Sequence, residues 1–136
     1  MQLKEHNLSS IASSVCLTLL TLSVFFVSRN RGPISAVTRF DQSVVTGDLK
    51  LLKTVSLQSL EDRSIQILWT HVRSFLRPNT PTQLTLVYKG DGNAHVAASY
   101  QLVDNNYASR LYFLKKHGSQ WYIDARATLA QSDDPK

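Results

Sequence analysis

Residues 65–88 read IQILWTHVRSFLRPNTPTQLTLVY, and this stretch decides the fold because its apolar spacing changes midway. Before Pro78, apolar side chains recur every three or four positions, which predicts a helix with one buried stripe. After Pro81 the period becomes two, since Leu84, Leu86 and Tyr88 alternate with polar or outward positions, and this predicts a strand. The change from helix to strand predicts an α+β domain.

Two shorter helices are expected before this stretch. Val37, Phe40 and Val44 recur at helical spacing within residues 34–46, so this segment is predicted to be the first helix of the domain. Gly47 suits the position just past its end, and Asp48 suits the cap of a second, short helix. Ser59 is the predicted cap of the long helix that follows.

Three further runs of alternating apolar residues follow the first strand. Short turns at 90–93, 104–106 and 116–119 separate them, which predicts a four-stranded antiparallel meander with the helices on one face. The predicted inner, helix-covered face carries Leu84, Val96, Leu111 and Trp121. The predicted outer face carries Val87, Tyr112, Leu114, Tyr122, Asp124 and Arg126.

The N-terminal segment 11–27 contains no charged residue and is followed by Arg29 and Arg31. Its length and apolar character predict a membrane-spanning helix. A cleaved signal peptide is less well supported because no good cleavage site follows, and a buried core helix is the third alternative. The predicted organisation is an N-terminal tail at 1–10, a transmembrane signal anchor at 11–28, a linker at 29–33, a folded domain at 34–130 and a disordered tail at 131–136.

Composition argues against several classes of function. The net charge is +5 in 136 residues, but the basic residues are interspersed with acidic ones, so we expect no nucleic-acid partner. The single cysteine, Cys16, lies in the apolar segment and leaves the domain without a disulfide or a cysteine-based metal site. The four histidines show no metal-ligand spacing, so no metal or cofactor is expected.

Two motifs carry a resemblance to a known family. The turn Thr46-Gly47-Asp48 follows a helix that contains Phe40, and residues 115–124 read KKHGSQWYID. The chain resembles the NTF2-like (cystatin-like cone) superfamily, and among its members the membrane-anchored bacterial domains of unknown function. The resemblance implies an N-terminal transmembrane helix followed by a cone of three helices packed on a curved four-stranded antiparallel sheet.

The resemblance also implies where binding takes place. A cone of this kind encloses a cavity, and its predicted lining residues are Tyr88, Tyr100, Trp69 and Phe113. Related domains pair through their sheets, and the predicted pairing surface for a homodimer or a protein partner consists of Tyr112, Leu114 and Tyr122. The predicted inner strand face holds no acidic residue or histidine, and acid–base catalysis requires such a group near its substrate. We therefore predict no catalytic residue.

The sequence thus predicts a single-pass, membrane-anchored domain of non-catalytic binding or scaffolding type. It would hold a protein partner or a small apolar ligand at the plasma (inner) membrane. The charges flanking the apolar segment are nearly balanced, and only the resemblance to anchored relatives favours a domain outside the cytoplasm. The alternatives are a component of an envelope assembly such as a VirB8-like secretion protein, and an enzyme acting in the cone cavity.

Overall fold

The computed structural model describes residues 13–19, which are helical, and residues 32–132. The chain divides into one unit at 1–30 and a second, compact unit at 31–136. Within the two described ranges, no helix combines the length and the apolar character needed to cross a bilayer. This finding contradicts the predicted transmembrane anchor at 11–28 and the single-pass plasma-membrane location that depended on it. The rest of that segment lies outside the described residues.

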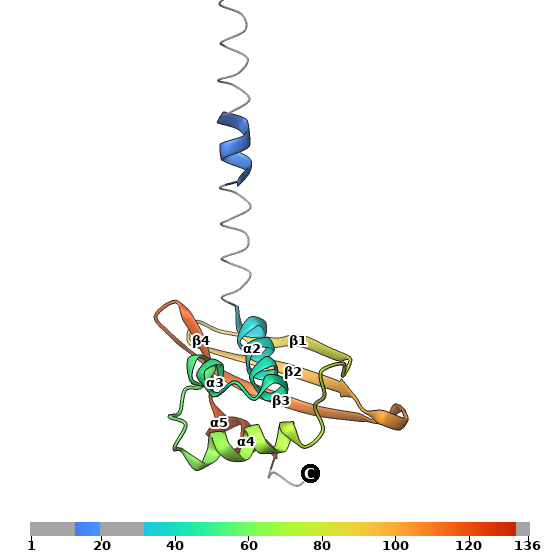
Figure 1. The fold of residues 1–136 in the computed structure, drawn as a ribbon. Coiled ribbons are helices and arrows are strands. Elements are labelled where there is room, and N and C mark those ends of the chain that lie inside the picture. Colours follow the sequence, from blue (N-terminus) through green and yellow to red (C-terminus); the bar gives the residue numbers. More distant parts are fainter. Residues whose placement is uncertain (1–12, 20–31, 133–136) are drawn as a thin grey trace, which may run out of the picture. The chain divides into compact units, whose positions relative to one another are not determined.

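The compact unit is α+β, as predicted, and its helices come mostly before its sheet (Figure 1). Helices α2 (Pro33–Thr46), α3 (Leu49–Val55) and α4 (Arg63–Arg73) precede four strands, and α5 (Ala125–Ser132) follows them. Gly47 ends α2 in the left-handed conformation, with φ of 70°, which glycine adopts without steric cost. Asp48 caps α3 by accepting from the backbone N–H groups of Lys50 and Leu51, which confirms that prediction.

The cap of α4 differs from the prediction. The Asp62 side chain accepts a hydrogen bond from the Ser64 backbone N–H at 2.9 Å and caps the helix, whereas the Ser59 hydroxyl accepts from the N–H of Glu61 in the preceding turn. Asp62 also forms an ion pair with Arg126 of α5. The helix therefore begins one turn later than the sequence suggested.

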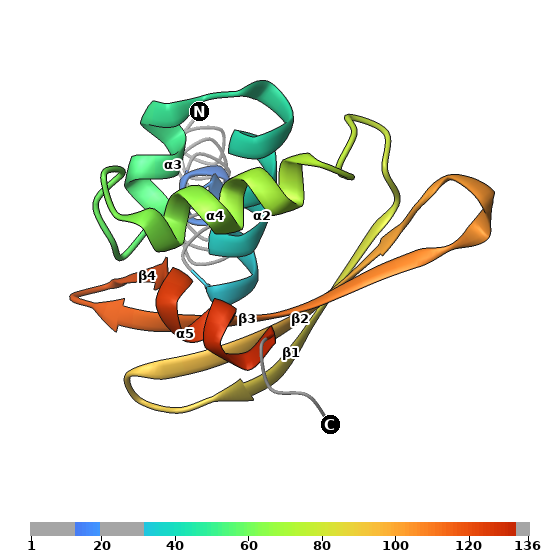
Figure 2. The ribbon, with the colours of Figure 1, turned by 90° about the horizontal axis from the view of Figure 1, so that it is seen from below.

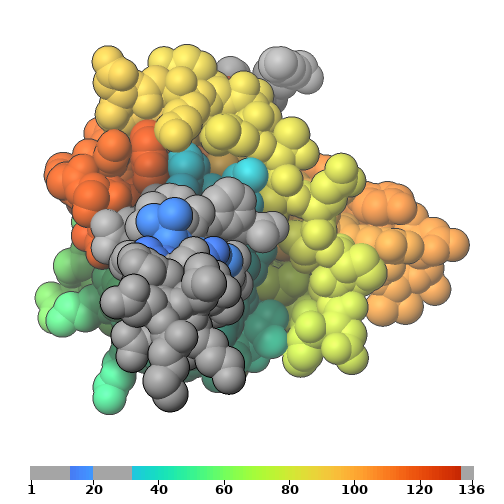
Figure 3. All heavy atoms as spheres, turned by 90° about the horizontal axis from the view of Figure 1, so that it is seen from above, coloured from blue at the N-terminus to red at the C-terminus, as the bar shows by residue number. Residues whose placement is uncertain are grey.

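The four strands form one antiparallel meander in the order β1-β2-β3-β4, which confirms the predicted topology. Their bounds are Thr82–Lys89, Asn93–Gln101, Tyr107–His117 and Gln120–Ile123. Helices α2, α3 and α4 lie over one face of the sheet (Figure 2). The β2–β3 turn protrudes from the domain (Figure 3), and its residues Asp104 and Asn105 have φ values of 69° and 58°. Two successive positive φ values are typical of a tight hairpin turn.

The facing of β3 is the reverse of the prediction. Tyr112 and Leu114, predicted for the outer face, are buried, with 0% and 1% of their surfaces exposed. Phe113 and Leu111, predicted for the inner face, are only partly buried. Apolar residues occupy both sets of alternate positions here, so the sequence period did not distinguish them. The pairing of β3 with β2, which places Tyr112 opposite Val96, determines the outcome.

The end of the chain also differs from the prediction. Strand β4 ends at Ile123, and the residues predicted to continue it, Ala125 included, form helix α5. Asp124, predicted for the outer face, is buried, and its Oδ1 accepts from the N–H of Ala127, as a helix cap does. Among residues 32–132 the domain therefore has four α-helices rather than three, and α5 extends to Ser132, inside the predicted tail.

Helix α5 covers the part of β3 that β4 leaves unpaired. The Thr128 hydroxyl accepts from the Phe113 backbone N–H at 3.0 Å, which satisfies a donor at this sheet edge. The core lies between the helices and the inner sheet face, and its largest fully buried side chains include Tyr100, Tyr112 and Phe40. Two of these are tyrosines, and a buried phenol hydroxyl requires a hydrogen-bond partner.

Candidate ligand-binding site

Asp41 of α2 provides the partner for the buried tyrosines. The hydroxyl of Tyr100 lies 2.9 Å from Oδ1 and 3.1 Å from Oδ2 of Asp41. The hydroxyls of Tyr100 and Tyr112 are 2.7 Å apart. Since an ionised carboxylate only accepts, Tyr100 donates to Asp41 and Tyr112 donates to Tyr100. The three residues therefore form one hydrogen-bonded chain from the core to the side of α2.

Strand register brings the two tyrosines together. Tyr100 lies opposite Ala108, while Tyr112 lies opposite Val96, so the two rings approach each other along adjacent strands. Ala98, between them on the same face, has too small a side chain to separate their hydroxyls. Phe40 packs edge-on against Tyr112, with ring centroids 5.7 Å apart, and Phe75 packs against Tyr100 at 5.2 Å. These contacts fix the direction of both hydroxyls.

Burial changes the acidity of all three groups. Desolvation raises the pKa of Asp41 to about 7, although the hydrogen bond from Tyr100 acts in the opposite direction. Desolvation also raises the pKa of Tyr100 and of Tyr112, and the nearby Asp41 carboxylate adds to both increases. Both phenols therefore stay neutral, and Asp41 is the group of this cluster that titrates near neutral pH.

A pocket of about 360 Å³ opens beside Asp41, within the size range of small-ligand sites. Helix α2, the end of α4 with the loop after it, and strand β1 form its walls. Asp41 and Arg77 are the only charged residues that line it. The remaining lining residues are neutral: Thr38, Gln42, Val45, Leu76, Pro78, Thr80, Thr82 and Leu84. A carboxyl group at the edge of a mainly apolar pocket is suited to fix the orientation of a small ligand.

Of the four residues predicted to line the cavity, only Tyr100 belongs to this cluster. A β-bulge between Leu86 and Tyr88 places Tyr88 opposite His95, on the outer face, where 51% of its surface is exposed. Phe113 packs against the other side of His95, with ring centroids 4.2 Å apart. Trp69 is partly buried beside the core, beneath the guanidinium of Arg73 at 4.7 Å.

The residues predicted for the pairing surface are divided between the two faces. Tyr112 and Leu114 belong to the core and are not available at the surface, as described above. Tyr122 is partly buried beside His117, and its hydroxyl donates to Gln120 at 2.9 Å. The exposed aromatic surface of the sheet is instead the row Tyr88–His95–Phe113, which crosses three strands.

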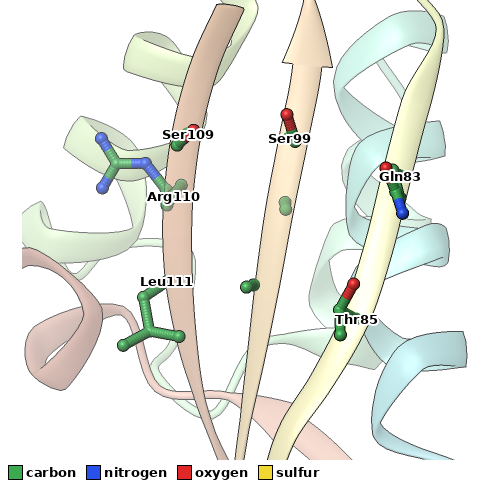
Figure 4. A pocket seen from close by; sticks show the side chains of 8 residues that line it. Gln83, Thr85, Ser99, Ser109, Arg110 and Leu111 are labelled. Carbon is green, nitrogen blue, oxygen red and sulfur yellow. The ribbon is translucent and has the colours of Figure 1, made fainter.

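A second hollow of about 380 Å³ lies on the sheet, over the middle strands. Gln83, Thr85, Ser99 and Ser109 project from neighbouring strands toward the viewer in Figure 4. The Arg110 side chain extends past the edge of β3, and its Nη1 donates to Ser132 of α5 at 3.1 Å. This shallow hollow contains hydroxyl and amide groups, but none of the groups just named on its floor titrates near neutral pH.

The sequence carries a signal for Asp41 in the first helix of the domain, which the pattern of the strands does not show. Asp41 follows the buried Phe40 directly, and valines lie four positions before and after it, at Val37 and Val45. An acidic residue beside an apolar helical stripe lies at the margin of the core. Within the described ranges, no group of three or more histidine, cysteine or acidic side chains is arranged to hold a metal ion.

Comparisons with known proteins add no relative: no family model, curated protein or solved structure matches this chain. The resemblance to the NTF2-like superfamily consequently stays a prediction. The assignment of function that follows depends on the geometry of the Asp41 pocket.

Proposed function

We propose that this chain is a non-catalytic NTF2-like binding domain whose pocket beside Asp41 takes a small, mainly apolar ligand. The observation that carries the proposal is a buried Asp41–Tyr100–Tyr112 chain that ends at a pocket of about 360 Å³. Apolar walls exclude water from the ligand, and the carboxyl supplies one hydrogen bond that selects its orientation. The order of helices and strands and the placement of the helices on one sheet face support the superfamily assignment.

Binding of the neutral fluorophore N-phenyl-1-naphthylamine to the full chain tests this proposal. Val45 lines the pocket, whereas Thr46, the next residue of α2, is exposed and does not line it. We expect saturable fluorescence enhancement with the unmodified chain and with Thr46→Trp, and its loss with Val45→Trp. Absence of saturable binding, or equal binding by both variants, contradicts the proposal.

An enzyme acting in the same cavity is the second candidate function. The Asp41 carboxyl is the inward acidic group that this alternative requires, and its pKa of about 7 suits proton transfer at neutral pH. Exchange of carbon-bound hydrogen in a simple ketone, cyclohexanone in deuterated buffer, tests it directly. Exchange that the full chain accelerates and Asp41→Asn abolishes supports catalysis. Exchange at the buffer rate excludes this base reaction for the probe and favours the binding function.

A further inference from the structure

Arg77 lies where two hollows meet. It lines the pocket beside Asp41, and it also lines a larger hollow of about 560 Å³ between the loop after α4 and the end of β2. Thr80 lines both hollows as well. The two cavities are therefore neighbours along one side of the domain, and Arg77 and Thr80 are the residues that they share.

The second hollow is mainly apolar. Its apolar walls are Phe75, Pro81, Leu102 and Val103, and Arg77 is the one charged residue that lines it. The neutral polar residues of the lining are Ser74, Asn79, Thr80 and Gln101. Phe75 packs against Tyr100, and Leu102 packs partly against the core, so these walls are supported from below. A hydrocarbon chain is the chemical group that such walls favour.

The backbone around the junction is held by hydrogen bonds. The Arg77 N–H donates to the Thr80 hydroxyl at 2.9 Å, and the Thr80 N–H donates to the Arg77 carbonyl at 3.1 Å. On the opposite wall, the Gln101 N–H donates to the Pro81 carbonyl at 2.9 Å. The hollow is therefore already formed before a ligand enters, which reduces the entropy lost on binding.

The Arg77 guanidinium has only weak partners of its own. Its Nη1 donates to the carbonyl oxygens of Arg73 at 3.3 Å and Leu76 at 3.4 Å, both long bonds. The two ion pairs found in residues 13–19 and 32–132 are Lys115–Asp124 and Arg126–Asp62, so no described carboxylate pairs with Arg77. A guanidinium presents a fork of donors that matches a carboxylate.

We propose that the two hollows form one elongated site for an aliphatic monocarboxylic acid, with its carboxylate on Arg77 and its hydrocarbon chain along Phe75, Leu102 and Val103. This inference rests on the proposed binding function and names the class of its ligand. The walls select against a ligand with a second negative charge, because Arg77 is the one cation among the lining residues. Asp41 is compatible with a bound carboxylate when it is protonated.

The test compares three probes with the same hydrocarbon chain: octanoate, octanol and octylamine, each displacing N-phenyl-1-naphthylamine from the full chain. We expect octanoate to bind roughly 10-fold or more tightly than octanol, since a hydrogen bond to a charged group is worth about 1.5–3 kcal/mol. Octylamine should bind most weakly. Butanoate should bind more weakly than octanoate because it leaves the apolar hollow unfilled.

Arg77→Gln should reduce octanoate binding to about the level of octanol, a larger loss than the same variant causes for octanol itself. Arg73→Gln is the matched control, since Arg73 lies one helical turn earlier, stacks on Trp69 and lines neither hollow. Octanoate binding no tighter than octanol, or unaffected by Arg77→Gln, overturns the ligand class while fluorophore binding upholds the binding function. If the fluorophore does not bind, calorimetric titration of the full chain with octanoate replaces the displacement assay, and absence of octanoate binding there means that both proposals fail.

Discussion

The two faces of the sheet carry similar aromatic residues in opposite settings. On the inner face, Tyr100 and Tyr112 are fully buried, and their hydroxyls are joined to each other and to Asp41. On the outer face, Tyr88 and Phe113 flank His95 in a row that remains partly exposed. Polar groups in the outer row can form hydrogen bonds with water. The hydroxyls of the inner pair are shielded from water and need a hydrogen-bond acceptor within the protein, which Asp41 provides.

This difference determines where the domain carries a carboxyl group that titrates near neutral pH. The buried hydroxyls hold a carboxyl group at the edge of the core, where desolvation brings its pKa close to neutrality. An exposed carboxylate would stay charged at that pH and would discriminate poorly between ligands. The following predictions test the contrast between the two faces, beginning with the largest expected effect.

Removing an inner-face contact should destabilise the domain far more than removing an outer-face one. Phe40 is fully buried and packs on Tyr112, so Phe40→Ala should lower the free energy of unfolding by roughly 3–5 kcal/mol. Tyr88→Ala, on the half-exposed outer row, should cost less than about 1 kcal/mol. Urea unfolding of the full chain measures both. Equal losses of unfolding free energy would show that the two faces contribute equally to stability, which would contradict the difference described above.

The Asp41 carboxyl should make stability depend on pH. Its pKa is about 7 when folded, against 3.8 for an ordinary aspartate, so the folded domain binds this proton more tightly than the unfolded chain does. The free energy of unfolding should therefore fall as pH rises from about 4 to about 7, by at most about 4 kcal/mol, and stay low above that range. The groups around Asp41 are Tyr100, Tyr112 and, in the same pocket, Arg77.

Asp41→Asn should remove this pH-dependent contribution while preserving an acceptor for Tyr100. As pH rises, the unmodified chain should therefore lose free energy of unfolding relative to the Asp41→Asn variant. Asp48→Asn, at the exposed cap of α3, provides the matched control and should leave the slope unchanged. A slope that survives Asp41→Asn would place its origin elsewhere in the domain.

Removing the Tyr100 hydroxyl should destabilise the domain more than removing the Tyr112 hydroxyl, because only the Tyr100 hydroxyl bonds to both other members of the chain. Tyr100→Phe removes both hydrogen bonds of the chain and leaves Asp41 and the Tyr112 hydroxyl unpaired, so we expect a loss of about 1–3 kcal/mol. Tyr112→Phe removes one terminal donor and should cost about 1 kcal/mol or less. Thermal unfolding compares the pair. A costlier Tyr112→Phe would contradict the order of the hydrogen-bond chain.

The smallest effect concerns an aspartate that is exposed rather than buried. Asp48→Ala removes the side-chain cap of α3 and should cost about 1 kcal/mol of unfolding free energy. Chemical unfolding of the full chain measures this cost. A loss as large as that expected for Phe40→Ala would show that this exposed cap stabilises the domain as much as a buried core contact does.

Much of the fold was predictable because its elements carry strong local signals. The switch of period at Pro78, the Gly47-Asp48 turn and the short hairpin turns led to the α+β class and the strand order. The facing of β3 was not predictable, since Leu111 and Phe113 compete with Tyr112 and Leu114 for the core. The sheet face on which Tyr88 lies was not predictable either, because a bulge after Leu86 turns its side chain to the outer face.

The candidate site was less predictable than the fold. Tyr100 was expected on the inner face, but its partner Asp41 belongs to a helix, and a contact between residues so distant in sequence depends on tertiary packing. Helix α5 was missed because its Asp124 cap and the residues after it follow a strand without a glycine or proline between. The predicted membrane anchor was the largest error, since no described helix is suited to span a bilayer.

The most direct test of the account is the pKa of the Asp41 carboxyl, measured from its ¹³C chemical shift in a pH titration of the full chain, with Asp41→Asn used to assign the signal. We expect a midpoint near 7, raised by burial beside Tyr100 and Tyr112. A midpoint near 4, the value of an exposed aspartate, would contradict the central claim that the inner face holds an ionisable group for ligand binding.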